Sequence, residues 1–118
     1  MKKTLLAFAM MIPIVASAAN LNCSIKASKT TKTADMQAMA KISADDAKKA
    51  ALGAVNVAGA TIAKGELEVE DGCLVYSYDV KVPGKSGAEE VYVDAGNGKI
   101  IKNVHETAAK EAVEKTKK

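Results

Sequence analysis

The strongest helical period in the chain begins after residue 42. Ser43 is followed by Asp45 and Asp46, an order typical of a helix start because the hydroxyl and the acids complement the free backbone N–H groups. At about 100° per residue, the small apolar side chains that follow lie on one arc of roughly 140°. They are Ala44, Ala47, Ala50, Ala51, Ala54, Val55 and Ala58. The pattern predicts an amphipathic helix with an alanine face, which ends at Gly59.

The period changes to two after residue 60, as expected for strands. Residues 61–70 alternate Leu67 and Val69 with glutamates, and Asp71 with Gly72 then predicts a tight hairpin turn. The next strand places Leu74, Tyr76, Tyr78, Val80 and Val82 on one face, and Cys73, Val75, Ser77, Asp79 and Lys81 on the other. We expect the first of these faces to receive the alanine face of the helix, at a short distance because alanine is small.

Two further strands complete the pattern. The stretch 83–87 interrupts the alternation, residues 89–94 form a third strand, and the turn 95–98 leads to a fourth strand over 99–105. One helix followed by antiparallel strands predicts an α+β fold, in which the helix packs on a three- to four-stranded meander sheet.

The ends of the chain differ from this central part. Residues 1–18 are typical of a signal peptide: Lys2 and Lys3 precede an apolar stretch and the small residues Ala16, Ser17 and Ala18. We therefore expect a periplasmic or secreted protein. Residues 19–41 are rich in lysine, threonine and alanine, which predicts a flexible leader with one short helical turn near 36–40, and 106–118 form a charged tail.

Charge and composition argue against two classes of function. Without Lys2 and Lys3 the formal charge falls from +3 to +1, and the chain has no arginine and no tryptophan. Nucleic-acid binding requires a clustered cationic surface, commonly with stacking aromatics, so no nucleic-acid partner is expected. No apolar run reaches the roughly 20 residues of a membrane-spanning helix, so the mature form is not expected to span a membrane.

Cys23 and Cys73 are the two cysteines of the exported part. In an oxidising compartment an even number of cysteines predicts a disulfide, here one that ties the leader to the back or the edge of the sheet. Two alternatives are lipid attachment at Cys23 and a metal site that combines both cysteines with His105. Neither the residues before Cys23 nor the ligand spacing favours them, and the sequence predicts no metal and no cofactor.

Two groups of polar residues are candidates for binding. Glu66, Glu68 and Glu70 share one strand face, and Pro83 with Lys85 lies in the longest break between strands. Carboxylates in this arrangement either form a solvated face or bind a cation weakly, with Asp94 and Asn97 as further oxygen ligands at a turn. Nothing sets a nucleophile beside the single histidine, His105, so no catalytic residue is predicted.

The order of these elements resembles the PepSY domain family. The residues that carry the resemblance are the helix start Ile42 to Ala47 and the segment Val91 to Ile101, with its turn at 95–98. The similarity covers roughly residues 42–105. It implies a small exported module, similar to the propeptides of secreted metallopeptidases, which restrain peptidase activity. The sequence has no H-E-x-x-H motif, so we expect such a module to act in trans.

Together these features predict an exported, non-enzymatic binding module that modulates or inhibits a peptidase in the cell envelope. Its partner would be a protein or peptide, received by strand addition at an open sheet edge. The alternative is a structural or sensory envelope protein that binds a cation or a surface polymer through its acidic face.

Overall fold

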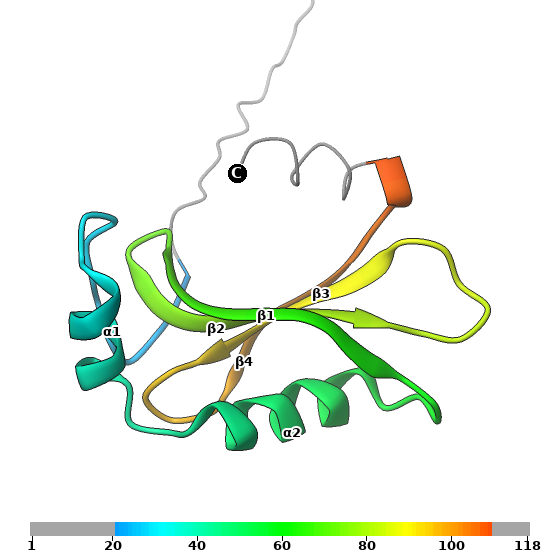
Figure 1. The fold of residues 1–118 in the computed structure, drawn as a ribbon, viewed down its shortest axis with the longest axis horizontal. Coiled ribbons are helices and arrows are strands. Elements are labelled where there is room, and N and C mark those ends of the chain that lie inside the picture. Colours follow the sequence, from blue (N-terminus) through cyan, green and yellow to red (C-terminus); the bar gives the residue numbers. More distant parts are fainter. Residues whose placement is uncertain (1–20, 110–118) are drawn as a thin grey trace, which may run out of the picture.

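A computed structural model describes residues 21–109 and shows two helices and a four-stranded sheet (Figure 1). The elements are α1 (Thr33–Met39), α2 (Ala44–Val55), β1 (Thr61–Glu70), β2 (Cys73–Lys81), β3 (Ala88–Asp94) and β4 (Ile100–Glu106). The strand order is β1-β2-β3-β4, and every neighbouring pair is antiparallel. The predicted α+β meander is thus confirmed, with four strands. The proposed signal peptide (1–18) and most of the charged tail (106–118) lie outside the described residues.

Helix α2 begins as the sequence predicts and ends earlier. The Ser43 hydroxyl accepts a hydrogen bond of 3.0 Å from the Asp46 backbone N–H. The predicted end at Gly59 is wrong, because the helix ends at Val55 and Asn56 adopts the left-handed conformation with φ 52°. Asparagine tolerates this conformation better than other non-glycine residues, so it caps the helix ahead of the glycine.

The alanine face of α2 packs on the sheet. Ala47 and Ala51 are fully buried in the main core. Their buried partners in that core are Leu74, Tyr76, Tyr78, Val80, Val91, Val93 and Ala95. Two predicted members of the alanine face, Ala44 and Ala58, are exposed at or beyond the ends of the helix, and Val82 follows the last residue of β2. The helix therefore contacts the predicted tyrosine face through its central turns.

The leader is more ordered than expected. In place of one turn near 36–40, it forms the seven-residue helix α1, whose Met36 and Met39 pack against the main core. Upstream, the Leu74 N–H donates to the carbonyl of Ile25 (3.0 Å), and the Ala27 N–H donates to the carbonyl of Gly72 (2.9 Å). The leader is held by isolated apolar side chains and by backbone hydrogen bonds. Neither produces a regular hydrophobic period, so the sequence pattern does not predict this structure.

The hairpin between β1 and β2 turns at Asp71 and Gly72, as predicted. Both residues have positive φ, 49° and 80°, which is the geometry of a type I′ turn. In Figure 1 this hairpin lies near α1, and the β2–β3 loop extends from the opposite end of the sheet. Within residues 21–109, no helix is long and apolar enough to cross a membrane.

Candidate functional site

Strand β1 is an outer strand of the sheet, and its register tells which backbone groups point outward. The N–H of Leu74 bonds to Ile25 and its carbonyl accepts from Ala95, so Leu74 directs no backbone hydrogen bond to its partner Val69. Because bonded and non-bonded pairs alternate in an antiparallel ladder, the outward backbone groups are those of Gly65, Leu67 and Val69. Across residues 21–109, no segment outside the sheet forms a backbone hydrogen bond with these three.

A groove of about 470 Å³ runs beside this edge, between the two helices and β1. It is lined by Gln37, Ala44, Lys48, Ile62, Ala63, Lys64, Gly65, Glu66, Leu67, Tyr76 and Tyr78. The rings of Tyr76 and Tyr78 are nearly parallel, at 5°, with centroids 6.3 Å apart. Gly65 is needed here, because a Cβ atom at this position would overlap the Tyr78 ring. The groove is thus a hollow of mixed polar and apolar lining next to open backbone.

The two tyrosine hydroxyls fix the segment that connects the helices. Tyr76 donates to the carbonyl of Ile42 at 2.9 Å, and Tyr78 donates to the carbonyl of Ala44 at 3.1 Å. Burial raises the pKa of both phenols, that of Tyr78 to about 12. Both hydroxyls are therefore protonated at neutral pH and remain hydrogen-bond donors.

The three glutamates of β1 lie on the sheet face opposite α2. They pair in register with Ser77, Val75 and Cys73, whereas Leu67 and Val69 between them pack against the main core. Burial is the largest cause that raises the pKa of Glu68, to about 8, and hydrogen bonds and charge repulsion from Glu66 and Glu70 add to it. The predicted row exists, and its middle member is mainly protonated at neutral pH.

Pro83 and Lys85 do not join this row. Pro83 lies in the exposed β2–β3 loop close to Gly59, and the Lys85 ammonium is 3.3 Å from a carboxylate oxygen of Glu89. Pro83 lies six positions beyond Ser77, the partner of Glu66, along β2 and its extension, which corresponds to about 20 Å of strand. The two predicted binding groups are therefore at separate places on the sheet.

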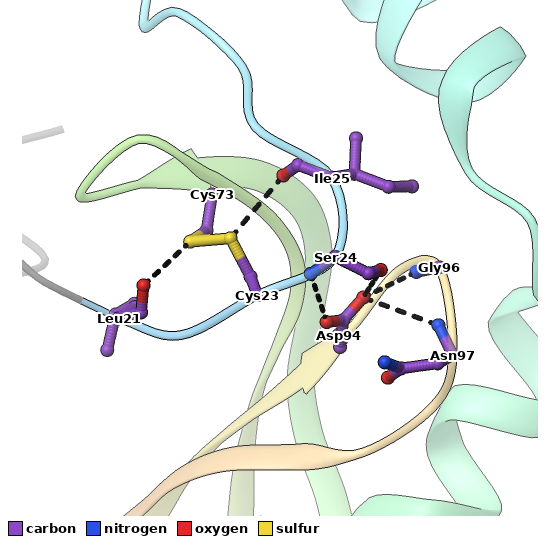
Figure 2. The surroundings of a disulfide bond; sticks show 8 residues. All are labelled: Leu21, Cys23, Ser24, Ile25, Cys73, Asp94, Gly96 and Asn97. Atoms are coloured by element: carbon purple, nitrogen blue, oxygen red, sulfur yellow. Dashed lines mark hydrogen bonds between the residues drawn. A yellow bond between two sulfur atoms is a disulfide. The ribbon is translucent and has the colours of Figure 1, made fainter.

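Asp94 is a structural clamp, and this removes it from the predicted cation ligands. It is buried, and its carboxylate accepts hydrogen bonds from the Ser24 N–H (2.7 Å), the Ser24 hydroxyl (2.6 Å), the Gly96 N–H (2.7 Å) and the Asn97 N–H (3.3 Å) (Figure 2). Burial would raise the pKa of Asp94, but these donors together hold it below its ordinary value. Asn97 in turn accepts from the Lys99 N–H at 2.9 Å.

The disulfide lies beside this clamp. Cys23 and Cys73 are bonded, with Cα atoms 5.9 Å apart, and Figure 2 shows the leader running past the bond toward Ser24. Cys73 is buried with Val75 and Tyr92 on the face opposite α2. The leader is therefore attached to the back of the sheet at two adjacent points, one through the disulfide and one through hydrogen bonds from Ser24 to Asp94.

A second acidic group joins three strands on this face. Carboxylate oxygens of Asp79, Glu90 and Glu106 lie within 4.8 Å of one another. Within residues 21–109, these are the side chains whose arrangement could hold a metal ion. Glu90 already pairs with the Lys102 ammonium at 2.9 Å. No local sequence pattern predicts this group, because its members come from β2, β3 and β4. His105, also on β4, contacts a carboxylate of Glu89, at 2.7 Å between Nδ1 and Oε2.

The groove was also missed from the sequence, although one signal was present. Gly65 interrupts the alternation of β1, and an isolated glycine in a strand often marks a close approach. Its meaning depended on the Tyr78 ring and on the position of α1, and the sequence pattern predicted neither contact.

Comparison with known proteins gives one result. The family model of PepSY, described as "Peptidase propeptide and YPEB domain", matches residues 41–103. Neither the curated proteins nor the solved structures contain a match to the chain. The match spans more than half of the chain and contains α2, all of β1, β2 and β3, and part of β4. The chain therefore belongs to the PepSY family.

Proposed function

We propose that this chain is an exported, non-enzymatic binding module that regulates a peptidase in trans, by receiving an extended segment of the peptidase or of its peptide substrate at β1. The observation that carries the proposal is the open backbone of Gly65, Leu67 and Val69 beside the groove, in a domain of a peptidase-propeptide family. Strand addition uses such an edge: main-chain hydrogen bonds provide affinity, and pockets for alternate side chains provide specificity.

The architecture supports this mode of binding. Edge strands are normally shielded by short length, by charge or by a covering segment, because they pair readily with other chains. Strand β1 has ten residues, and along its outward positions 65, 67 and 69 only small or aliphatic side chains occur. Its glutamates alternate with these positions, and of its charged residues only Lys64 and Glu66 line the groove.

Export is part of the proposal. It is supported by the signal-like pattern of residues 1–18 and by the disulfide, which is characteristic of oxidising compartments. A location in the periplasm or outside the cell would bring the module together with secreted peptidases.

The test is inhibition of a panel of secreted metallopeptidases by the purified chain without residues 1–18. Ala63→Trp should fill the groove, because Ala63 is exposed and lines it. Ala58→Trp is the matched control, since Ala58 is exposed in the loop after α2 and does not line the groove. We expect the parent and the control to change peptidase rates, and Ala63→Trp to lose at least most of this effect. Unchanged rates across the panel would refute peptidase regulation.

Cation binding by the acidic face is the second candidate function. The cluster of Asp79, Glu90 and Glu106 is a better candidate site for it than the predicted ligands Asp94 and Asn97, because the Asp94 carboxylate already accepts hydrogen bonds. The pairing of Glu90 with Lys102 weighs against it, because it supplies the cluster with a cation from the chain itself. A calorimetric Ca²⁺ titration separates the two functions. Heat of binding that disappears in Glu106→Gln would favour the second, and a flat thermogram would dispose of it.

A further inference from the structure

We infer that the segment received at β1 is an extended strand in which basic and large apolar side chains alternate. The inference rests on strand addition at β1, the binding mode of the proposed function, and it specifies the chemistry of the partner. It follows from the different character of the two faces of this edge.

The face opposite α2 selects basic side chains. Glu66, Glu68 and Glu70 follow one another at every second position on this face. A strand added along β1 would place its own alternate side chains about 5 Å from them, where opposite charges attract and like charges repel. Charge is already disfavoured within the row, since burial first, and then the neighbouring Glu66 and Glu70, raise the pKa of Glu68. Lysine or arginine at every second position of the partner would offset the repulsion among these carboxylates.

The other face selects apolar side chains. There the partner meets the groove, with the stacked rings of Tyr76 and Tyr78 and the aliphatic side chains of Ile62 and Leu67. Lys48 lies on the α2 side of the same groove and would repel a basic side chain that the partner directed into the groove. The charges therefore favour one register of the partner strand, in which its basic side chains lie on the glutamate face and its apolar side chains lie in the groove. A shift by one residue would exchange all of its side chains between the two faces.

The same charges argue against a second copy of this chain as the occupant. Two β1 strands pairing antiparallel about Glu68 would bring the glutamates of one copy opposite those of the other, whereas pairing about Leu67 would set Glu66 opposite Glu68 and Lys64 opposite Glu70. Acidic residues on this edge thus act against self-association and leave the edge available to a strand of the opposite charge.

The test uses blocked heptapeptides and isothermal titration calorimetry with the chain lacking residues 1–18. The first probe alternates three lysines with two leucines between terminal threonines. Its isomer has the same composition with contiguous lysines and leucines, and a third peptide carries glutamates in place of the lysines. We expect the alternating basic peptide to bind at least about tenfold more tightly than either control, since cross-strand charge pairs with the ionised glutamates of the row and the groove act together.

Variants locate the effect on the protein. Glu66→Gln combined with Glu70→Gln should reduce the preference for the basic over the acidic peptide by about tenfold. Asp35→Asn combined with Asp46→Asn removes the same number of charges from exposed positions on the helices, and should preserve the preference. Circular dichroism of each variant establishes that it is folded.

Each outcome decides between the claims. Equal affinity for the two lysine isomers, or a preference that survives loss of Glu66 and Glu70, would overturn the alternating partner. Concentration-dependent dimers in sedimentation that dissociate in Ala63→Trp would also overturn it, in favour of a second copy. Peptidase inhibition without any preference for the basic peptide refutes this inference and leaves the proposed function standing. A preference for the basic peptide without inhibition of any peptidase refutes peptidase regulation and leaves this inference standing.

Discussion

Two carboxyl groups of this domain, Glu68 and Asp94, have opposite environments and opposite consequences. Glu68 lies between two other glutamates, and burial and its neighbours raise its pKa to about 8. Asp94 lies among four hydrogen-bond donors that keep its pKa below the ordinary value despite its burial. Asp94 therefore stabilises the fold as an anion, whereas ionisation of Glu68 opposes it. A residue that costs stability at neutral pH is typical of a binding surface.

Glu68→Gln should change how stability depends on pH. The pKa of Glu68 is about 8 in the folded protein and near the ordinary 4.5 when unfolded, so the folded state binds the extra proton between these values. Its contribution is present below pH 4.5 and is lost as pH rises toward 8. The variant should be more stable than the parent at pH 9 by about 1 kcal/mol, a value that allows for solvent screening.

Urea unfolding between pH 5 and pH 9 measures this effect. Asp35→Asn, an exposed change on α1, should follow the pH dependence of the parent. A Glu68→Gln variant whose stability declines with pH as steeply as that of the parent would contradict the assignment.

Asp94→Asn should be strongly destabilising. The amide is uncharged and has one oxygen where the carboxylate has two, so all four donors would lose their charged acceptor and at least one would lose its acceptor altogether, at a cost of about 2–3 kcal/mol at pH 7. Because the pKa of Asp94 is depressed in the folded protein, its contribution to stability depends on pH. That contribution is present above the ordinary pKa of 3.8 and is lost as pH falls through the pKa of the folded state. Ser24→Ala, which removes only one of the donors, should cost about 1 kcal/mol. Equal losses for the two variants in urea unfolding would show that Asp94 is no clamp.

At the scale of elements, α2 is distinguished by how little side-chain volume it buries. Its fully buried residues, Ala47 and Ala51, allow the helix to lie close to the tyrosine face of β2. That proximity places the backbone at Ile42 and Ala44 within reach of the Tyr76 and Tyr78 hydroxyls. The groove beside β1 therefore depends on the short distance between α2 and the sheet.

Ala51→Leu should force α2 away from the sheet, because Ala51 is completely buried and a larger side chain overpacks the contact. We expect a loss of about 1–3 kcal/mol in thermal or urea unfolding. Gly53→Ala is the control on the same helix. An added Cβ there meets nothing within 4 Å, so this change should stabilise the protein by about 0.5–1 kcal/mol. A neutral Ala51→Leu would refute the close packing of α2.

The elements of the central domain could be predicted from the sequence, and the binding groove could not. Period, capping and turn residues locate α2, the four strands and the turn at Asp71 and Gly72, because these signals are local. The groove depends on contacts between distant segments: α1 closes one side of it, and the clamp that holds the leader joins Ser24 to Asp94 across 70 positions. The stop of α2 was misplaced because Asn56 and Gly59 both suit a helix end, and only the structure shows which of them adopts the left-handed conformation.

At the scale of the whole molecule, the leader and the sheet form one unit. The disulfide between Cys23 and Cys73 and the clamp at Asp94 attach the leader to the back of the sheet. From there the chain continues into α1, which borders the groove on the other face. The attachment on one face thereby helps to position a wall of the groove on the other.

Loss of the disulfide should therefore lower both stability and binding. The bond closes a loop over a sequence separation of 50, for which chain entropy predicts about 4 kcal/mol. Urea unfolding of the double variant Cys23→Ala with Cys73→Ala should show a decrease of this size. Thiol titration of the purified parent chain is the accompanying check, and two free thiols with an unchanged unfolding midpoint would contradict the attachment.

The central claim, that β1 is an open edge that receives a partner strand, is tested most directly by residue-resolved amide hydrogen exchange. In the free protein, the outward N–H groups of Gly65, Leu67 and Val69 should exchange much faster than those of Glu66 and Glu68, which face β2. Saturation with an inhibited peptidase or the bound basic peptide should slow the three outward amides. Protection of these amides in the free protein, or no change when the partner is bound, would contradict the account.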